Sequence, residues 1–249
     1  MLESVPAPLL YIVFALYGLA TGSLAGALSY RLPRRQPVIF DRSRCTSCGA
    51  TLGARDLIPV LSWLLAKGRC RHCKAPVSSR YLWIELAVTA LFLAALALAP
   101  NLWAAVCLAF LGAGLVVLIV ADLEARILPD PIQAGLALLA LGWQASTQAE
   151  WQDMILGGGL GLGVGLLLRL SYLALKKRHG LGMGDVKFLG VAGLWLGLAA
   201  LPSFLLLAGL LGVAFGLVWR LATGNKVFPF GPALAAALFL TLAVLPVIR

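Results

Sequence analysis

Charged residues are scarce in this sequence of 249 residues. Asp, Glu, Lys and Arg together make up 12% of it, whereas hydrophobic residues make up 61%. The mean hydropathy is +0.95. A water-soluble domain of this length could not hide so much apolar side chain from water. The scarcity of charge therefore argues against a soluble globular protein and favours the lipid bilayer as the solvent.

Histidine is also rare, because the sequence contains only His72 and His179. Serine hydrolases use a histidine to activate the nucleophile, and neither of these residues has a convincing serine partner. His179 ends the basic run that starts at Lys176, where the end of a helix is a sufficient explanation. The sequence therefore gives no support to serine–histidine catalysis.

Strand-like alternation is missing, and apolar runs of about 16–22 residues recur instead. A helix needs about 20 residues to cross the hydrocarbon, and its backbone groups are satisfied within the segment. We therefore expect an all-α polytopic membrane protein with about eight transmembrane helices. The expected spans are 8–29, 81–99, 102–121, 132–147, 154–174, 186–201, 203–222 and 231–247.

The Lys and Arg residues predict the topology, because basic residues collect in cytoplasmic loops. Eleven of the 20 lie between Arg31 and Arg80, and only Arg249 falls outside if the first helix runs inward. We therefore expect both termini outside the cytoplasm and the segment from Arg31 to Arg80 inside it. The first eight residues contain Glu3 and no basic segment, so we do not expect a cleavable signal peptide. Topology and anionic lipid headgroups, and not nucleic acid, explain the net charge of +10.

The chain is expected to have three parts: a first helix over 1–30, a cytoplasmic insert over 31–80 and a seven-helix membrane domain over 81–249. Four of the five cysteines lie in the insert as two pairs with the same spacing. The pairs are Cys45 with Cys48 and Cys70 with Cys73. Four thiolates at this spacing can converge on one tetrahedral Zn²⁺. We expect this zinc to be structural, because four cysteines leave no open position for a substrate.

Free or redox-active thiols and two disulfides stay open as alternatives, although a cytosolic location disfavours disulfides. Gly49 and Lys74 follow the two pairs and suit tight turns around a metal. His72 lies inside the second pair, but four cysteines already complete the tetrahedron. Cys107, in the third apolar run, is interpreted as a small buried apolar residue.

Glycine recurs at a spacing of four in two apolar runs. These glycines are Gly18, Gly22 and Gly26 in the first run, and Gly157, Gly161 and Gly165 in the fifth. A dinucleotide-binding loop would follow a strand, and the second set does not. Because faces of small residues let membrane helices approach closely, we expect helix–helix contacts at both sets.

Acidic side chains lie at the predicted cytoplasmic ends of several apolar runs. They are Glu85, Asp122, Asp130 and Asp185. Ionisable groups at membrane depth cost energy and are functional candidates. Asp130 precedes Pro131 and is expected to cap a helix N-terminus. Asp122 ends a helix, where the helix dipole does not stabilise a carboxylate, so stability alone would not select it.

Asp122 and Asp185 are the catalytic candidates. Two carboxyl groups in different environments can hydrolyse a peptide bond, because an ionised one takes a proton from water and a protonated one donates to the carbonyl oxygen. Asp185 lies at a predicted helix N-terminus with Lys187 nearby, whereas Asp122 lies at a predicted helix C-terminus. We therefore hypothesise that Asp185 is the base and Asp122 the acid.

The segment Gly182-Met-Gly-Asp185-Val-Lys187 resembles the GxGDxK motif of the bacterial prepilin peptidases, a family of membrane aspartic proteases. The resemblance continues in order through nearly the whole chain. It includes Gly22-Ser23, Tyr30–Pro33, both cysteine pairs, Ile58-Pro59, Ser62-Trp63, Arg80-Tyr81, Glu85, the segment 122–130 and Pro229–Pro232. Each piece is weak, but the ordered set is specific.

The resemblance implies a bifunctional enzyme of the bacterial inner membrane, so that the two outer termini would lie in the periplasm. Such enzymes cleave the leader of type IV prepilins and type II secretion pseudopilins at the cytoplasmic membrane face, and then methylate the new N-terminal amine with S-adenosylmethionine. It maps the catalytic pair onto Asp122 and Asp185 and the family's cysteines onto the two pairs above. The residues that bind S-adenosylmethionine are not identified.

Several positions depart from the family pattern in the first helix and near the insert. They are Gly26, Thr46, Leu57 and Leu82. Because we associate this region with methylation, a peptidase without methyltransferase activity stays an alternative. A membrane transporter or scaffold with a structural zinc insert is another, although we see no convincing internal repeat of the kind that transporters often show.

Overall fold

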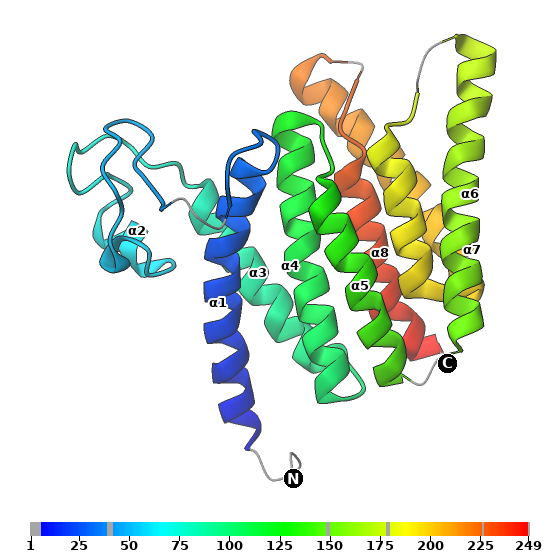
Figure 1. Cartoon of the computed structure of the whole chain (residues 1–249), viewed down its shortest axis with the longest axis horizontal. Coiled ribbons are helices and arrows are strands. Elements are labelled where there is room, and N and C mark those ends of the chain that lie inside the picture. Colours follow the sequence, from blue (N-terminus) through cyan, green and yellow to red (C-terminus); the bar gives the residue numbers. More distant parts are fainter. Residues whose placement is uncertain (1–5, 39–41, 148–149, 178–179, 226, 249) are drawn as a thin grey trace. The chain divides into compact units, whose positions relative to one another are not determined.

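The computed structural model describes residues 6–38, 42–147, 150–177, 180–225 and 227–248, and side chains up to residue 243 (Figure 1). These residues form helices and no β-strand, apart from two isolated bridges in the insert. The all-α prediction is confirmed. The elements are α1 (Ala7–Arg31), η1 (Ala54–Asp56), α2 (Leu61–Leu65), α3 (Arg80–Leu98), α4 (Leu102–Ala125), α5 (Asp130–Thr147), α6 (Trp151–Lys176), α7 (Met183–Thr223) and α8 (Gly231–Ile248).

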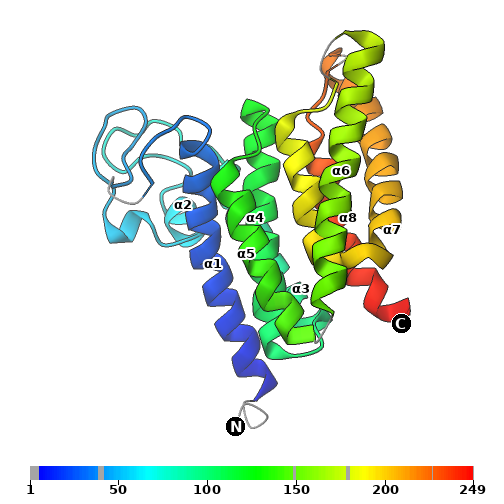
Figure 2. The same ribbon diagram turned by 45° about the vertical axis from the view of Figure 1, so that its right-hand side comes forward.

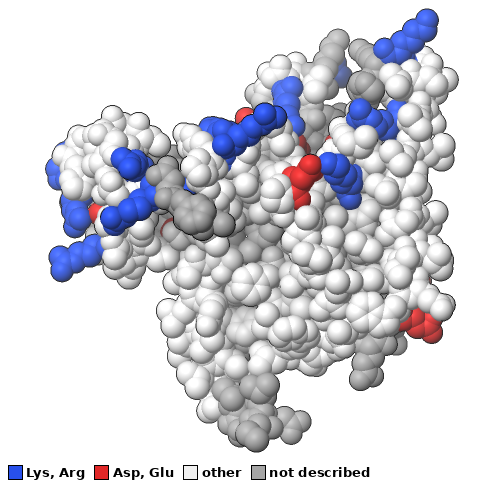
Figure 3. All heavy atoms as spheres, in the orientation of Figure 1, with Lys and Arg blue, Asp and Glu red and all other residues white. Residues whose placement is uncertain are grey.

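Five of these helices, α1, α3, α4, α6 and α7, are long and apolar enough to cross a membrane. The described apolar part of α8, Gly231–Ala243, is shorter than these five helices. On the face shown in Figure 3, Lys and Arg gather over the insert and at one end of the helices, and the long sides of the helices are almost free of charge. The chain is therefore a multi-pass membrane protein.

Helix α7 combines the sixth and seventh expected spans. It runs for 41 residues but contains one non-helical residue, Gly197, with φ 69° and ψ −176°. Figures 1 and 2 show that α7 turns between its yellow and orange parts, so that it consists of two arms that run in opposite directions. The expected boundary at residue 202 was wrong by five residues. Pro202 lies inside the second arm, five residues after Gly197.

The reversal is held by Asp153 from the first turn of α6. Its Oδ1 accepts a hydrogen bond of 2.9 Å from the N–H of Leu198, the residue that starts the second arm. The side chain therefore supplies an N-terminal cap from a neighbouring helix. The local sequence around Asp153 does not predict this role.

We expect Gly197→Ala to destabilise the protein by about 2 kcal/mol or more, because only glycine adopts this backbone conformation readily. A Cβ at this position would also overlap the carboxylate of Asp153. Thermal unfolding in detergent measures the effect. Gly209→Ala, in the second arm, is the matched control, because a Cβ there meets nothing within 4 Å. Equal stability of the two variants would contradict the structure.

The described chain forms two compact units, Met1–Val117 and Leu118–Arg249. In the first unit, the small face of α1 lies directly on α3. A Cβ on Gly18 would lie 2.8 Å from Cα of Thr89, and one on Gly22 would lie 2.7 Å from Cα of Glu85. Gly26 lies against the ring of Tyr81. The predicted close approach along the first helix is confirmed.

In the second unit, the glycine face of α6 lies on the first arm of α7. Gly157 faces Gly193 and Gly197, and a Cβ on Gly161 would overlap the carbonyl of Leu189. The prediction for this set is therefore also confirmed. On the other side of this arm, the buried Trp195 donates a hydrogen bond of 2.9 Å from Nε1 to the carbonyl of Leu136 on α5. These contacts hold α5, α6 and the first arm of α7 together.

Candidate functional site

The four cysteines of the insert converge. Their Sγ atoms all lie within 4.8 Å of one another. The Sγ atoms of Cys45 and Cys73 are 3.9 Å apart, too far for a disulfide bond. The convergence predicted from the spacing is thus confirmed. Cys107 lies apart on α4 and is almost fully buried, as expected.

Both cysteine pairs are held by the same backbone turn. The N–H of Gly49 bonds the carbonyl of Cys45, and the N–H of Lys74 bonds the carbonyl of Cys70, each at 2.9 Å. Gly49 and Lys74 have positive φ values of 71° and 60°. The tight turns expected after each pair are therefore present. An exposed ion pair of 3.1 Å between Arg71 and Asp56 links the second turn to η1.

The thiols of Cys45 and Cys73 differ in how readily they lose a proton. Backbone hydrogen bonds from Cys48 and Ser47 lower the pKa of the Cys45 thiol to about 6. For Cys73, the backbone N–H of Ala75 lowers the pKa, but desolvation and hydrogen bonding with the neighbouring thiols outweigh it and raise the pKa to about 11. Several thiolates so close together are stable only when a cation neutralises them.

The geometry suits a tetrahedral metal ion. A Zn–S bond of about 2.3 Å gives an S–S edge of about 3.8 Å, which is close to the 3.9 Å between Cys45 and Cys73. The donor set is entirely thiolate, which soft or borderline metals prefer. The cysteine cluster therefore fits a metal ion with four protein ligands.

Glu85, the acidic residue predicted one turn into the second span, lies in the first unit and is buried. Its Oε2 accepts a hydrogen bond of 2.6 Å from the N–H of Val60, and its side chain also bonds that of Ser23. Val60 has a positive φ of 62° and directly precedes α2. Glu85 therefore ties the insert to α1 and α3.

Asp122 lies in the last turn of α4, as predicted, and is 6% exposed. Its Oδ2 accepts a buried hydrogen bond of 2.7 Å from the N–H of Gly231, the first residue of α8. The carboxylate of Asp122 therefore also meets the N-terminal end of a second helix. The sequence showed only the helix that carries Asp122 and not the one that faces it.

Asp185 lies in the first turn of α7. Its Oδ2 accepts a hydrogen bond of 3.2 Å from the N–H of Gly182, which is the half of a capping box that the third helical residue supplies. Both carboxylates thus accept backbone N–H groups at helix N-termini. Asp185 was assigned as the base and Asp122 as the acid because they lie at opposite helix ends. That difference between the two sites is smaller than the sequence indicated, and the assignment stays a prediction.

The two aspartates come together within the second unit. Leu128 lies against both Gly231, which bonds Asp122, and Gly184, which precedes Asp185. A Cβ placed on Gly231 would lie 2.9 Å from the side chain of Leu128, and one placed on Gly184 would lie 3.1 Å from it. The charge on Asp122 also acts on Asp185. The two carboxyl groups are therefore close enough for the charge of one to affect the other. This arrangement can share and transfer protons.

Asp130, the first residue of α5, has a role that the sequence did not indicate. Both of its carboxylate oxygens lie 2.8 Å from Nζ of Lys187, two residues after Asp185. The pair is largely exposed, so it contributes only about 0–1 kcal/mol to stability. It joins the start of α5 to the first turn of α7. The expected capping role is not among the contacts that the structure shows for this side chain.

We expect Gly231→Ala to lower the activity of the aspartate pair by on the order of a hundredfold, since displacing a catalytic group by about 1 Å has that effect. The new Cβ would lie 2.7 Å from Oδ2 of Asp122. The measurement is the cleavage rate of the substrate proposed below. Gly135→Ala on α5 is the control, because its Cβ would meet nothing within 4 Å. Equal rates for both variants would contradict this geometry.

Comparison with known proteins gives two family matches. The Bacterial Peptidase A24 N-terminal domain matches residues 16–99, and the Type IV leader peptidase family matches residues 109–217. The first match lies within the first compact unit and contains the cysteine cluster and Glu85. The second match contains both aspartates and their surroundings, except for Gly231.

Curated relatives cover most of the chain. A "Prepilin leader peptidase/N-methyltransferase" from Burkholderia pseudomallei (strain 1026b) is 40% identical over 82% of this chain and 68% of its own. One from Neisseria gonorrhoeae is 31% identical over 94% and 90%. The "Type 4 prepilin-like proteins leader peptide-processing enzyme" of Escherichia coli O78:H11 is 34% identical over 88% of each chain. No solved structure was found to match the chain.

These relatives exceed 30% identity over more than two thirds of each chain, and the matched family is one of aspartic proteases. The chain therefore belongs to the Type IV leader peptidase family.

Proposed function

We propose that this chain removes the leader peptide from type IV prepilins, and that Asp122 and Asp185 are its catalytic pair. One observation carries the proposal: two carboxyl groups from α4 and α7 converge around Leu128, each held by a backbone N–H. Relatives that span most of the chain are named as prepilin leader peptidases. Pseudopilins of type II secretion are included in the proposed substrates.

Hydrolysis requires one carboxyl group to be ionised and the other to be protonated. One carboxylate takes a proton from a water molecule as that water attacks the scissile carbonyl, and the other donates a proton to the carbonyl oxygen. Gly231 and Gly182 fix the orientation of the two groups through their N–H donors. We keep Asp185 as the base and Asp122 as the acid, a choice that rests on the helix to which each belongs.

The proposed second activity is methylation of the new N-terminal amine with S-adenosylmethionine. It rests on the names of the relatives, which include N-methyltransferase. S-adenosylmethionine would supply an electrophilic methyl group, and the deprotonated amine would attack it. The described residues show no nucleotide-binding sheet, so we assign no residue to this substrate.

We propose a structural Zn²⁺ on Cys45, Cys48, Cys70 and Cys73, with the insert in the cytoplasm and both ends of the chain in the periplasm. The basic residues support this orientation, because eleven of the 20 lie between Arg31 and Arg80. Cleavage then takes place at the cytoplasmic face, because the aspartates lie at the same predicted side.

The test is incubation of the purified enzyme with a prepilin and S-adenosylmethionine, followed by mass measurement of the product. The proposal expects loss of the leader and a gain of one methyl group, and it expects the Asp122→Asn and Asp185→Asn variants to methylate an already cleaved pilin. A cleaved but unmethylated product would support the peptidase alternative. An intact prepilin would overturn the proposal and favour a transporter or scaffold.

A further inference from the structure

The insert contains an apolar segment, Leu57–Leu65, whose large side chains are exposed. Their relative exposures are 42% for Leu57, 46% for Ile58, 56% for Leu61, 52% for Leu64 and 82% for Leu65. They project neither into the cysteine cluster nor into the contact between α1 and α3. Five large apolar side chains exposed within nine residues are more than the single scattered ones of an ordinary surface, and they indicate an interaction surface.

The segment is fixed at the depth of the first turns of α3. The N–H of Val60, inside the segment, donates to Oε2 of Glu85, which lies one turn into that helix. Trp63 donates from Nε1 to the carbonyl of Val77 at 3.1 Å, which holds α2 to the segment that leads into α3. Figure 1 shows α2 at the lower edge of the insert. The apolar patch is therefore level with the end of a membrane span and not beyond it.

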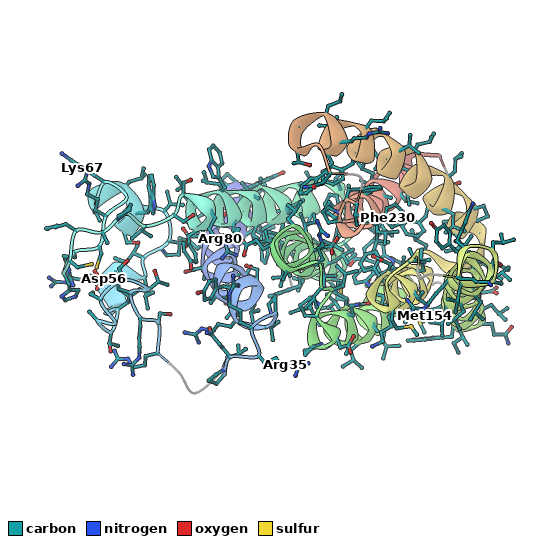
Figure 4. All side chains as sticks on the ribbon, turned by 90° about the horizontal axis from the view of Figure 1, so that it is seen from above. Arg35, Asp56, Lys67, Arg80, Met154 and Phe230 are labelled. Atoms are coloured by element: carbon teal, nitrogen blue, oxygen red, sulfur yellow. The ribbon has the colours of Figure 1, made fainter. Side chains whose placement is uncertain are left out.

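The insert also lies to one side of the two helices. Figure 4, a view along the helices, shows Asp56 and Lys67 displaced sideways from Arg80 at the start of α3. On α3 itself, Trp83 is 66% exposed and Leu86 is 40% exposed, as expected of side chains that face lipid. Tryptophan is enriched at membrane–water interfaces. Exposed apolar side chains are therefore present both on the insert and near the start of α3, the helix to which Glu85 ties the insert.

The charged residues near the segment also favour a lipid membrane as its partner. Arg55 and Lys67 are exposed at the two ends of the segment. Asp56, the acidic residue next to it, is paired with Arg71. A short segment with apolar side chains on one side and basic residues at its ends is typical of chain that lies in the lipid headgroup layer.

We propose that Leu57–Leu65 is an interfacial membrane anchor, inserted into the headgroup layer of the bilayer that α3 crosses. The exposed leucines and Ile58 enter the boundary of the acyl chains, and Arg55 and Lys67 contact anionic phosphates. Glu85 sets the depth of the anchor through Val60. The inference stands on the fold alone and does not depend on the proposed function.

The test uses the full-length protein in vesicles of phosphatidylethanolamine and phosphatidylglycerol. A fluorescent amino acid is incorporated at Leu65, or at Ser47 in the first cysteine turn as the matched control, since both positions are exposed. Phospholipids brominated near the headgroup are the quencher. We expect at least a twofold loss of fluorescence at position 65 and none at 47. Equal quenching at both positions, or none at 65, would overturn the proposal.

A second variant separates insertion from folding. In L61S/I58S protein labelled at position 65, quenching should fall while the metal content and the helical circular dichroism stay unchanged. Undiminished quenching would contradict a role for these side chains. Adding a synthetic prepilin peptide tests the competing partner: if position 65 responds only to the peptide and not to brominated lipid, the surface binds protein and the anchor is wrong.

Discussion

The Asp122→Asn and Asp185→Asn variants are each expected to lose prepilin cleavage, by at least about a hundredfold. Removing either member of an acid–base pair removes one proton transfer, and such transfers contribute about 10²–10⁴-fold to rates. Asparagine keeps the size of the side chain and can still accept the N–H of Gly231 or Gly182, so the fold should persist. The measurement is the initial rate of leader removal by purified variants in detergent.

Asp130→Asn is the matched control for these two variants. Its carboxylate binds Lys187 at the surface and does not belong to the proposed pair. We expect its cleavage rate to stay within a few fold of that of the unmodified enzyme, with at most a small loss of stability. If Asp122→Asn or Asp185→Asn cleaved at a similar rate to Asp130→Asn, the proposed dyad would be wrong.

Replacement of the four cysteines by serine is expected to release one zinc ion per chain and to disorder residues 40–75. Zinc binding supplies folding free energy to small inserts, with apparent values of about 10–16 kcal/mol in zinc-finger peptides. The described insert has little apolar core to replace the metal, since its large apolar side chains are exposed, namely Leu57, Ile58, Leu61, Leu64 and Leu65. Metal analysis and limited proteolysis measure the two effects.

Cys107→Ser is the control for the cysteine variants, because Cys107 lies on α4 away from the cluster. It should leave the metal content unchanged. Membrane insertion of the helices should persist in all of these variants, because the spans are apolar without the insert. Freshly purified protein without zinc, with all of its thiols free, would refute the metal site.

Local pattern predicted much of this molecule. Apolar length gave the helices, glycine spacing gave the contacts of α1 with α3 and of α6 with α7, and cysteine spacing gave the four-sulfur cluster. Each of these features depends on residues a few positions apart on one element, or on two repeated short motifs. Such periodicities are visible in a single sequence.

The interactions that were missed join residues far apart in the chain. Asp122 bonds Gly231, 109 positions away, and Asp130 pairs with Lys187 across 57 positions. No local pattern encodes these partners, so Asp130 was read as a helix cap and Asp122 as a carboxylate facing only the end of its own helix. The reversal in α7 was misplaced for the same reason, because Asp153 stabilises it from α6.

The turn inside α7 also bears on how the protein is inserted. Its two arms are joined at Gly197 with no polar loop between them, and the N–H that opens the second arm is satisfied by a side chain from the preceding span. Emerging alone from the translocation machinery, this turn would expose unpaired backbone groups to lipid, which is costly. The three segments from Trp151 to Thr223 are therefore expected to enter the bilayer as one cooperative bundle, in which α6 acts as the template for the hairpin that follows it.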